Sequence, residues 1–321
     1  MRARPDGRMI DRTEGAARVE DEMSDRKFRF GAVVGMAGNL EQWATTAKWV
    51  EDAGYDVLVT ADTPNISSPF VSLTAAAAAT TTLRVGTFVI AVPLHTVGSI
   101  AWDSASLDRL SGGRFELGLG AGRPDAEREA GVLGMPWGSP RRRVEQVGEV
   151  IGGVRRIFAD ATEAAAKSEG RGFDGGGFLR PEQRPHPPIM VAGAGPSLLR
   201  LAAQEADIIA LGISGNAGDD QLAEKVAIVR AQAGDRFDDI ELSVNIWGAG
   251  ESTVPDWVAG AFGLDLSKAK DNNAVAVLNG SPAEIADVLL RRRDQFGVSY
   301  LTINNLAMEA FAPVIELLSG R

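Results

Sequence analysis

Residues 107–122 read LDRLSGGRFELGLGAG, and this stretch contains the end of one structural element and the whole of the next. A helical pattern closes at Leu110, and the glycines that follow it are typical of a helix stop. Residues 115–119 are a short apolar run typical of a buried strand, and a glycine-rich turn comes after them. This order of helix, tight turn, strand and loop predicts one unit of an α/β fold.

The same unit recurs along the chain on both sides of this stretch. From Phe28 onward, β-branched apolar runs alternate with longer helical patterns, which indicates βα units around a parallel sheet. Strands are expected at 30–34, 57–60, 84–90, 115–119, 189–192, 208–211, 241–246 and 300–303. Helices are expected at 40–53, 68–80, 98–110, 141–158, 196–204, 221–234, 282–296 and 307–318. Eight strands, each followed by a helix, predict an α/β fold of the (β/α)8 TIM barrel type.

The length of the chain allows this barrel to form one domain, which we expect at residues 28–321. Residues 1–27 are charged throughout, and we expect them to be a flexible extension. Two further stretches, 160–188 and 248–279, are longer than a plain barrel requires, and we interpret both as insertions. The second follows the seventh strand, at the face where the loops of a barrel build the active site.

Composition argues against several classes of function. A net charge of −10 disfavours binding to nucleic acid or to an anionic membrane. The chain has no cysteine and its first residues lack the apolar core of a signal peptide, so a cytoplasmic protein is expected. His95 and His186 are the only histidines and neither has acids clustered near it, so no catalytic metal site is expected.

Glycine-rich loops follow the fourth and fifth predicted strands. The first contains Gly118, Gly120 and Gly122, and the second reads VAGAGPS at 191–197. Exposed amides at the start of the helix that follows the second loop would form an anion site for a phosphate. Tight βα turns alone would also explain either loop. Together the two loops favour a phosphorylated cofactor that supplies the chemistry itself, because few acids, bases or metal ligands lie at the strand ends.

Residues 107–122 resemble the signature of the luciferase-like flavin and deazaflavin oxidoreductases, and the resemblance extends over residues 28–320. It implies a barrel of the bacterial-luciferase type. Residues 224–242 and the stretch MEAFAP at 308–313 most resemble a branch of this family that uses coenzyme F-420. The resemblance therefore implies F-420 as cofactor, with FMN as the alternative.

The resemblance also implies roles for particular residues. Asp62 matches an acidic position beside the cofactor ring, and Phe88 and Val89 match a non-prolyl cis peptide that supports the ring. We expect Asp62 and His95 to be catalytic, although Asp62 could instead cap a turn and His95 could bond to the backbone at a helix entry. The remaining cofactor contacts are expected from two loops, at Gly120, Ala121, Gly122, Ala192, Gly193, Ala194, Gly195 and Pro196.

The chain also departs from the family pattern. Thr63 follows Asp62 where many deazaflavin enzymes have histidine, and Leu94-His95-Thr96 stands in place of Arg-His-Pro. Arg123 stands where a sugar-phosphate dehydrogenase branch has a catalytic glutamate, so that activity is not expected.

The expected function is that of an F-420-dependent oxidoreductase. We expect it to act as a reductase that transfers hydride between the deazaflavin and a small organic substrate with a C=C or C=N bond. Two alternatives stay open: an FMN-dependent luciferase-like monooxygenase, and a non-catalytic flavin-binding protein. Assembly into a homodimer is a further expectation that the sequence leaves open.

Overall fold

A closed barrel of parallel strands forms the centre of the molecule. The computed structural model describes residues 26–35, 38–167, 179–250, 254, 259–260 and 263–321. Neighbouring strands pair in parallel around the ring, and pairing of β3 with β5 closes it. The barrel strands are β1 (Arg29–Val33), β2 (Val57–Thr60), β3 (Arg84–Thr87), β4 (Ile90–Ala91), β5 (Phe115–Gly120), β6 (Ile189–Gly193), β7 (Ile208–Leu211), β8 (Glu241–Ile246) and β11 (Val298–Asn304). Because β3 and β4 share one position beside β5, the predicted eight-position barrel is confirmed.

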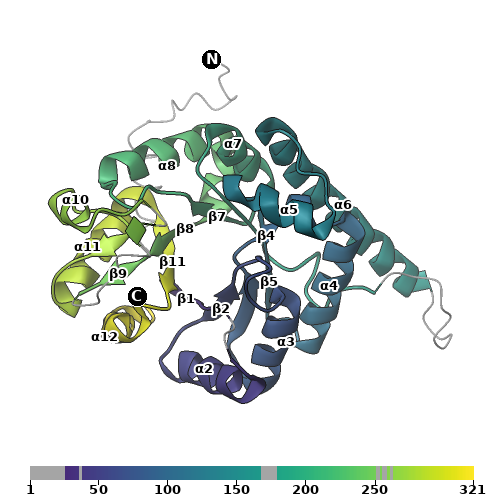
Figure 1. The fold of residues 1–321 in the computed structure, drawn as a ribbon, viewed down its shortest axis with the longest axis horizontal. Helices are drawn as coiled ribbons and strands as arrows, with labels where there is room; N and C mark the ends of the chain where they lie inside the picture. Colours follow the sequence, from purple (N-terminus) through teal and green to yellow (C-terminus); the bar gives the residue numbers. More distant parts are fainter. Residues whose placement is uncertain (1–25, 36–37, 168–178, 251–253, 255–258, 261–262) are drawn as a thin grey trace, which may run out of the picture.

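Helices surround this barrel on its outside (Figure 1). They are α2 (Leu40–Asp52), α3 (Pro69–Ala79), α4 (Val97–Leu110), α6 (Pro140–Lys167), α7 (Pro196–Glu205), α8 (Asp219–Ala233), α11 (Pro282–Phe296) and α12 (Met308–Leu318). Two shorter helices, α5 (Glu127–Leu133) and α10 (Leu266–Asp271), lie in the segments after β5 and β9. Each of the eight predicted helices is present. Helix α6 continues to Lys167, into the stretch expected to be the first insertion, and α5 was not predicted.

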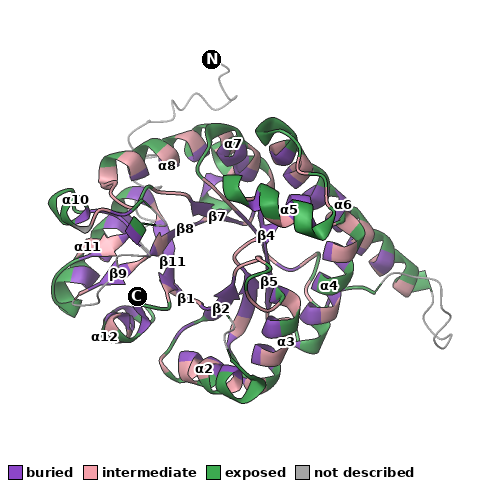
Figure 2. Ribbon diagram, viewed as in Figure 1, coloured by how far each residue is buried: buried purple, intermediate pink, exposed green. Residues whose placement is uncertain are grey.

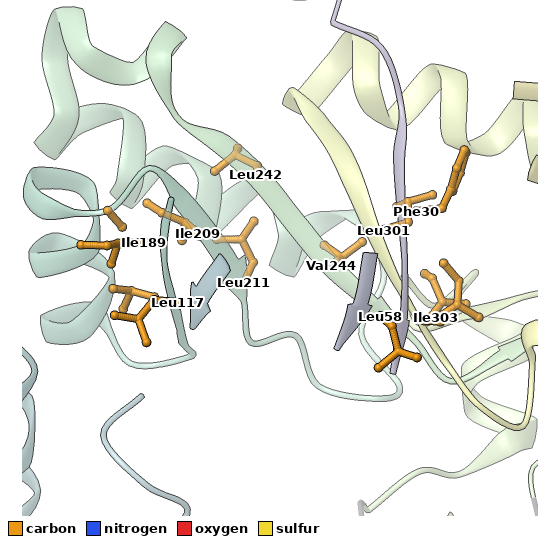
Figure 3. Packing of buried hydrophobic residues seen from close by; sticks show 14 of the residues in the cluster. Phe30, Leu58, Leu117, Ile189, Ile209, Leu211, Leu242, Val244, Leu301 and Ile303 are labelled. Atoms are coloured by element: carbon orange, nitrogen blue, oxygen red, sulfur yellow. The ribbon is translucent and has the colours of Figure 1, made fainter. Parts of the chain in front are cut away.

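Side chains alternate between two apolar layers because successive residues of a strand point to opposite faces. In β2, Leu58 packs outward in the layer between strands and helices, which Figure 3 shows together with Ile209 and Leu301. Val57 and Val59 point inward, where they form a second cluster with residues of β6, β7 and β11. The strands are buried and exposed residues gather on the outer helices (Figure 2).

The end of the barrel where the strands begin is filled by charged side chains. Glu116 accepts hydrogen bonds from Arg29 at 2.5 Å and from Arg84 at 2.6 Å, and Arg29 also pairs with Glu241. The Arg29 guanidinium lies 4.6 Å from the ring centre of Tyr300. Burial raises the pKa of Tyr300 well above its ordinary value, so its phenol stays protonated. This network closes the barrel at the end opposite to the strand ends where such folds carry active sites.

The segment after β8 packs as a small unit of its own. Strands β9 (Gly248–Ala249) and β10 (Val277–Leu278) pair in parallel, and a separate apolar cluster includes Leu264 and Ala269. Asn216, in the loop after β7, accepts a hydrogen bond from Asp265 N at 2.7 Å and donates to Gly263 O at 3.1 Å. These bonds hold the second predicted insertion against the loop after β7.

Residues 1–25 of the expected N-terminal extension and 168–178 of the first expected insertion lie outside the described residues. Arg26 contacts the barrel, since its guanidinium donates to Ile240 O at 2.6 Å. Within the described part of the chain, none of the helices combines the length and the apolar character needed to cross a bilayer.

Candidate active site

A break in the third barrel strand forms one wall of the candidate site. The continuous strand predicted at 84–90 is wrong, because the chain leaves the sheet at Phe88 and Val89, which are joined by a cis peptide bond. The cis bond expected from the family resemblance is thereby confirmed at the expected pair. Both side chains pack against the inner apolar cluster of the barrel. The hydroxyl of Thr87 accepts from Gly118 N at 2.8 Å and donates to Gly118 O at 2.9 Å. These two hydrogen bonds satisfy the backbone N–H and C=O of Gly118 on the neighbouring strand β5, beside the break.

The glycines of β5 allow this break to lie close to the strand. A Cβ atom on Gly118 would lie 1.9 Å from Thr87 O, and one on Gly120 would lie 2.7 Å from Val89 Cγ2. Gly122, which has a φ of +78°, would meet the Trp137 ring at 2.6 Å. Packing therefore explains why these positions are glycine. The predicted contact of Gly120, Ala121 and Gly122 with a cofactor stays a prediction.

Asp62 and His95 are brought together at the C-terminal ends of the strands. Asp62 follows β2, and His95 follows the short 3-10 helix η1 (Val92–Leu94). The imidazole Nε2 lies 2.8 Å from Asp62 Oδ2, which also accepts from Ala91 N at 2.9 Å. Because a carboxylate only accepts hydrogen bonds, the imidazole donates from Nε2 and its Nδ1 can exchange a proton with a substrate.

The partners of the two side chains differ from those that their alternative local roles would require, and their catalytic role stays a prediction. Their exposed fractions are 10% for Asp62 and 26% for His95, so the pair is largely desolvated but can be reached from solvent. Asp62 accepts from Ala91 at the end of β4 instead of capping its own turn, and the His95 ring bonds to a carboxylate instead of the backbone. Desolvation raises the pKa of Asp103 on α4, and the nearby His95 opposes that shift.

The loop after β6 has the form expected of an anion site. Helix α7 begins at Pro196, and its N-cap Gly195 provides no side-chain cap for the first amides. A Cβ atom on Gly195 would have no atom within 4 Å, whereas one on Gly193 would meet Leu198 at 2.3 Å. The Lys225 ammonium donates to Ala194 O at 2.7 Å and adds positive charge to the loop. Open space at Gly195, a helix start without a side-chain cap and a nearby lysine are compatible with a phosphate there.

Lys225 and the residues around α5 were not predicted as site residues. Lys225 lies within a helix, far along the chain from Ala194, so no local pattern connects the two. On α5, Glu129 accepts from Thr63 at 2.9 Å and from Arg123 at 2.8 Å. The start signal was present in the sequence, since acids follow Pro124, and Gly134 ends the helix.

The closed barrel, with the Asp62–His95 pair at the C-terminal ends of its strands, has the architecture of the TIM-barrel class of proteins. The family model for luciferase-like monooxygenases matches residues 26–249. The chain belongs to this family, as its sequence resemblance implied.

Individual relatives within this family differ in their activities. The chain is 31% identical over 230 residues to 4-hydroxyprotoasukamycin monooxygenase of Streptomyces nodosus subsp. asukaensis, covering 67% of this chain and 61% of that protein. It is 32% identical over 136 residues to the F-420-dependent glucose-6-phosphate dehydrogenase of Beutenbergia cavernae, covering 42% and 39%. The chain spans between about half and three fifths of the length of the first relatives it matches.

Solved structures share the fold. The coenzyme F-420-dependent tetrahydromethanopterin reductase of Methanopyrus kandleri superimposes with a TM-score of 0.66 at 17% identity, covering 91% of this chain and 98% of that one. This likeness concerns the barrel architecture alone.

Proposed function

We propose that the protein is a coenzyme F-420-dependent oxidoreductase that reduces a C=C or C=N bond of a small organic molecule. The observation that carries the proposal is the hydrogen-bonded Asp62–His95 pair beside the cis bond at Phe88 and Val89. Bound reduced F-420 would supply the hydride. His95 would deliver the accompanying proton from Nδ1, and Asp62 would stabilise the imidazolium and fix its orientation.

Two loops and the break in the third strand would hold this cofactor. Phe88 and Val89 would support the ring, with Gly120, Ala121 and Gly122 alongside. Residues Ala192, Gly193, Ala194, Gly195 and Pro196 would surround the phosphate, which would bind at the uncapped start of α7 with Lys225 beside it. The branch-specific resemblance at 224–242 and 308–313 and the F-420-dependent relative support F-420.

An FMN-dependent monooxygenase is the second candidate, because a relative 31% identical to this chain is a monooxygenase. The same loops would bind the FMN phosphate, so the two candidates differ in the cofactor and in the need for oxygen.

Thermal unfolding and anaerobic turnover test the choice between them. Reduced F-420 should raise Tm more than FMN at equal concentration, because a ligand that binds only the folded state stabilises it by mass action, by about 2.7 kcal/mol at 100 times Kd. With reduced F-420 and a panel of enones and imines, product should form without oxygen. Larger stabilisation by FMN, or product that carries oxygen-18 from the gas, would establish the monooxygenase instead.

Replacing Gly195 by valine should weaken cofactor binding at least about tenfold while the barrel stays folded. The side chain would fill the open space at the start of α7, where we place the phosphate. Fluorescence titration with F-420 gives the affinity and circular dichroism checks the fold. Gly152→Val is the matched control, since Gly152 also has open space but lies on the exposed face of α6. Equal affinities of the two variants would assign the turn to structure alone.

A further inference from the structure

Glu129 is a largely buried carboxylate on α5 that the proposed mechanism does not use. Its side chain is 14% exposed, and its Oε1 accepts hydrogen bonds from both Thr63 and Arg123. The other oxygen, Oε2, is buried without a hydrogen-bond partner among the described residues. Leaving a buried carboxylate oxygen unpaired costs free energy, so a buried glutamate at this position calls for an explanation.

Helix α5 contacts the chain on both sides of the Asp62–His95 pair. Through Glu129 it binds Thr63, which directly follows Asp62. Through the buried Ala130 it packs against Ala91 and Leu94 in one apolar cluster. Leu94 directly precedes His95, and Ala91 donates its backbone N–H to Asp62. A single short helix thus touches the neighbours of both members of the pair.

The loop that carries Asp62 depends on such contacts for its shape. Residues 61–68 form neither helix nor strand, so few backbone hydrogen bonds fix their path. The Thr63 hydroxyl has one hydrogen, which it donates to Glu129 at 2.9 Å. Arg123 holds Glu129 from the other side through a charge-assisted bond at 2.8 Å. Two bonds therefore fix the carboxylate that anchors this loop.

We propose that Glu129 is a positioning residue that holds Asp62 against His95 through Thr63. The inference rests on the proposed function, in which the Asp62–His95 pair handles the proton. Loss of the Thr63–Glu129 bond lets the loop move and lengthens the Asp62–His95 hydrogen bond.

Solvent exchange of the His95 ring N–H measures this effect directly and needs neither substrate nor cofactor. The chain has only two histidines, so a His186→Asn variant assigns the His95 signal in a protein with isotope-labelled histidine. Exchange should be about tenfold faster in Thr63→Val and in Glu129→Ala, which is the effect of losing one hydrogen bond. Thr63→Ser keeps the hydroxyl and should restore slow exchange. Glu127→Ala, an exposed carboxylate on the same helix, should leave exchange as in the wild type.

Two further measurements separate positioning from general damage. F-420 affinity should stay within about twofold of wild type in Thr63→Val, while kcat in the anaerobic assay falls about tenfold. Wild-type exchange in folded Thr63→Val and Glu129→Ala would overturn the inference, whatever turnover shows. Faster exchange in both variants, combined with full turnover when Asp62 itself is replaced, would leave the positioning intact and refute the proposed function.

Discussion

Replacing Glu116 by alanine should destabilise the barrel by about 3–5 kcal/mol, the cost of breaking a buried ion pair from one side. The Glu116 side chain is 4% exposed and is shared by Arg29 and Arg84. Without it, Arg29 keeps Glu241, but Arg84 loses the carboxylate with which it pairs. Burial raises the pKa of Glu241, the charge of Glu116 adds to this shift and Arg29 opposes it. Removal of Glu116 therefore removes one repulsion from Glu241, which offsets a small part of the lost stability.

Urea unfolding followed by circular dichroism gives the free energy of unfolding for this comparison. Glu149→Ala is the matched control, because it removes a carboxylate from an ion pair with Arg142 that is exposed on both sides. Exposed pairs contribute about 0–1 kcal/mol, so the control should unfold almost as wild type. A loss of stability in Glu116→Ala no larger than in the control would show that the network does not support the barrel.

The elements with clear periodicity could be predicted from sequence. The strands at 57–60, 208–211 and 241–246 and the helix at 282–296 have the predicted bounds. Each of these strands is a compact apolar or alternating run, and the helix has both a capping box at Ser281 and a glycine stop at Gly297. Local signals and tertiary packing agree there, so the pattern was sufficient.

The break at Phe88 and Val89 has no local signal. The run from 84 to 90 is apolar and β-branched, so periodicity predicted one strand, and only the family resemblance indicated a cis bond. What allows the break is Gly118, which lies on another strand and makes room for Thr87 O. A pairing between distant residues of this kind is not visible in either segment alone.

The candidate site shows the same limit. Asp62 and His95 were expected to be catalytic separately, but their 2.8 Å contact depends on how η1 turns after the broken strand. Glu129 was missed because its partner Thr63 lies 66 residues earlier. Sequence indicated which side chains lie at the strand ends, and folding determined which of them meet.

Replacing Asp62 by asparagine should lower turnover by about 10²–10⁴-fold, the usual contribution of a positioned proton-transfer group. Asparagine can still accept from Ala91 N, so the loop should keep its path. Its amide would present a donor or a neutral acceptor to His95, which removes the negative charge that stabilises the imidazolium and no longer enforces a proton at Nε2. The proton would then be missing at the moment when the hydride is transferred.

Single-turnover oxidation of reduced F-420 in the absence of oxygen measures this effect on the chemical step. Asp103→Asn is the matched control, because Asp103 interacts electrostatically with His95 but lies on the exposed side of α4. We expect less than about a tenfold change for the control, since solvent screens the interaction. F-420 affinity should stay as in the wild type in Asp103→Asn and should fall much less than turnover in Asp62→Asn, because the loop that we propose to bind the phosphate lies between β6 and α7. If Asp62→Asn transfers hydride as fast as the control, the pair does not handle the proton, and Asp62 serves only to fix the loop to Ala91.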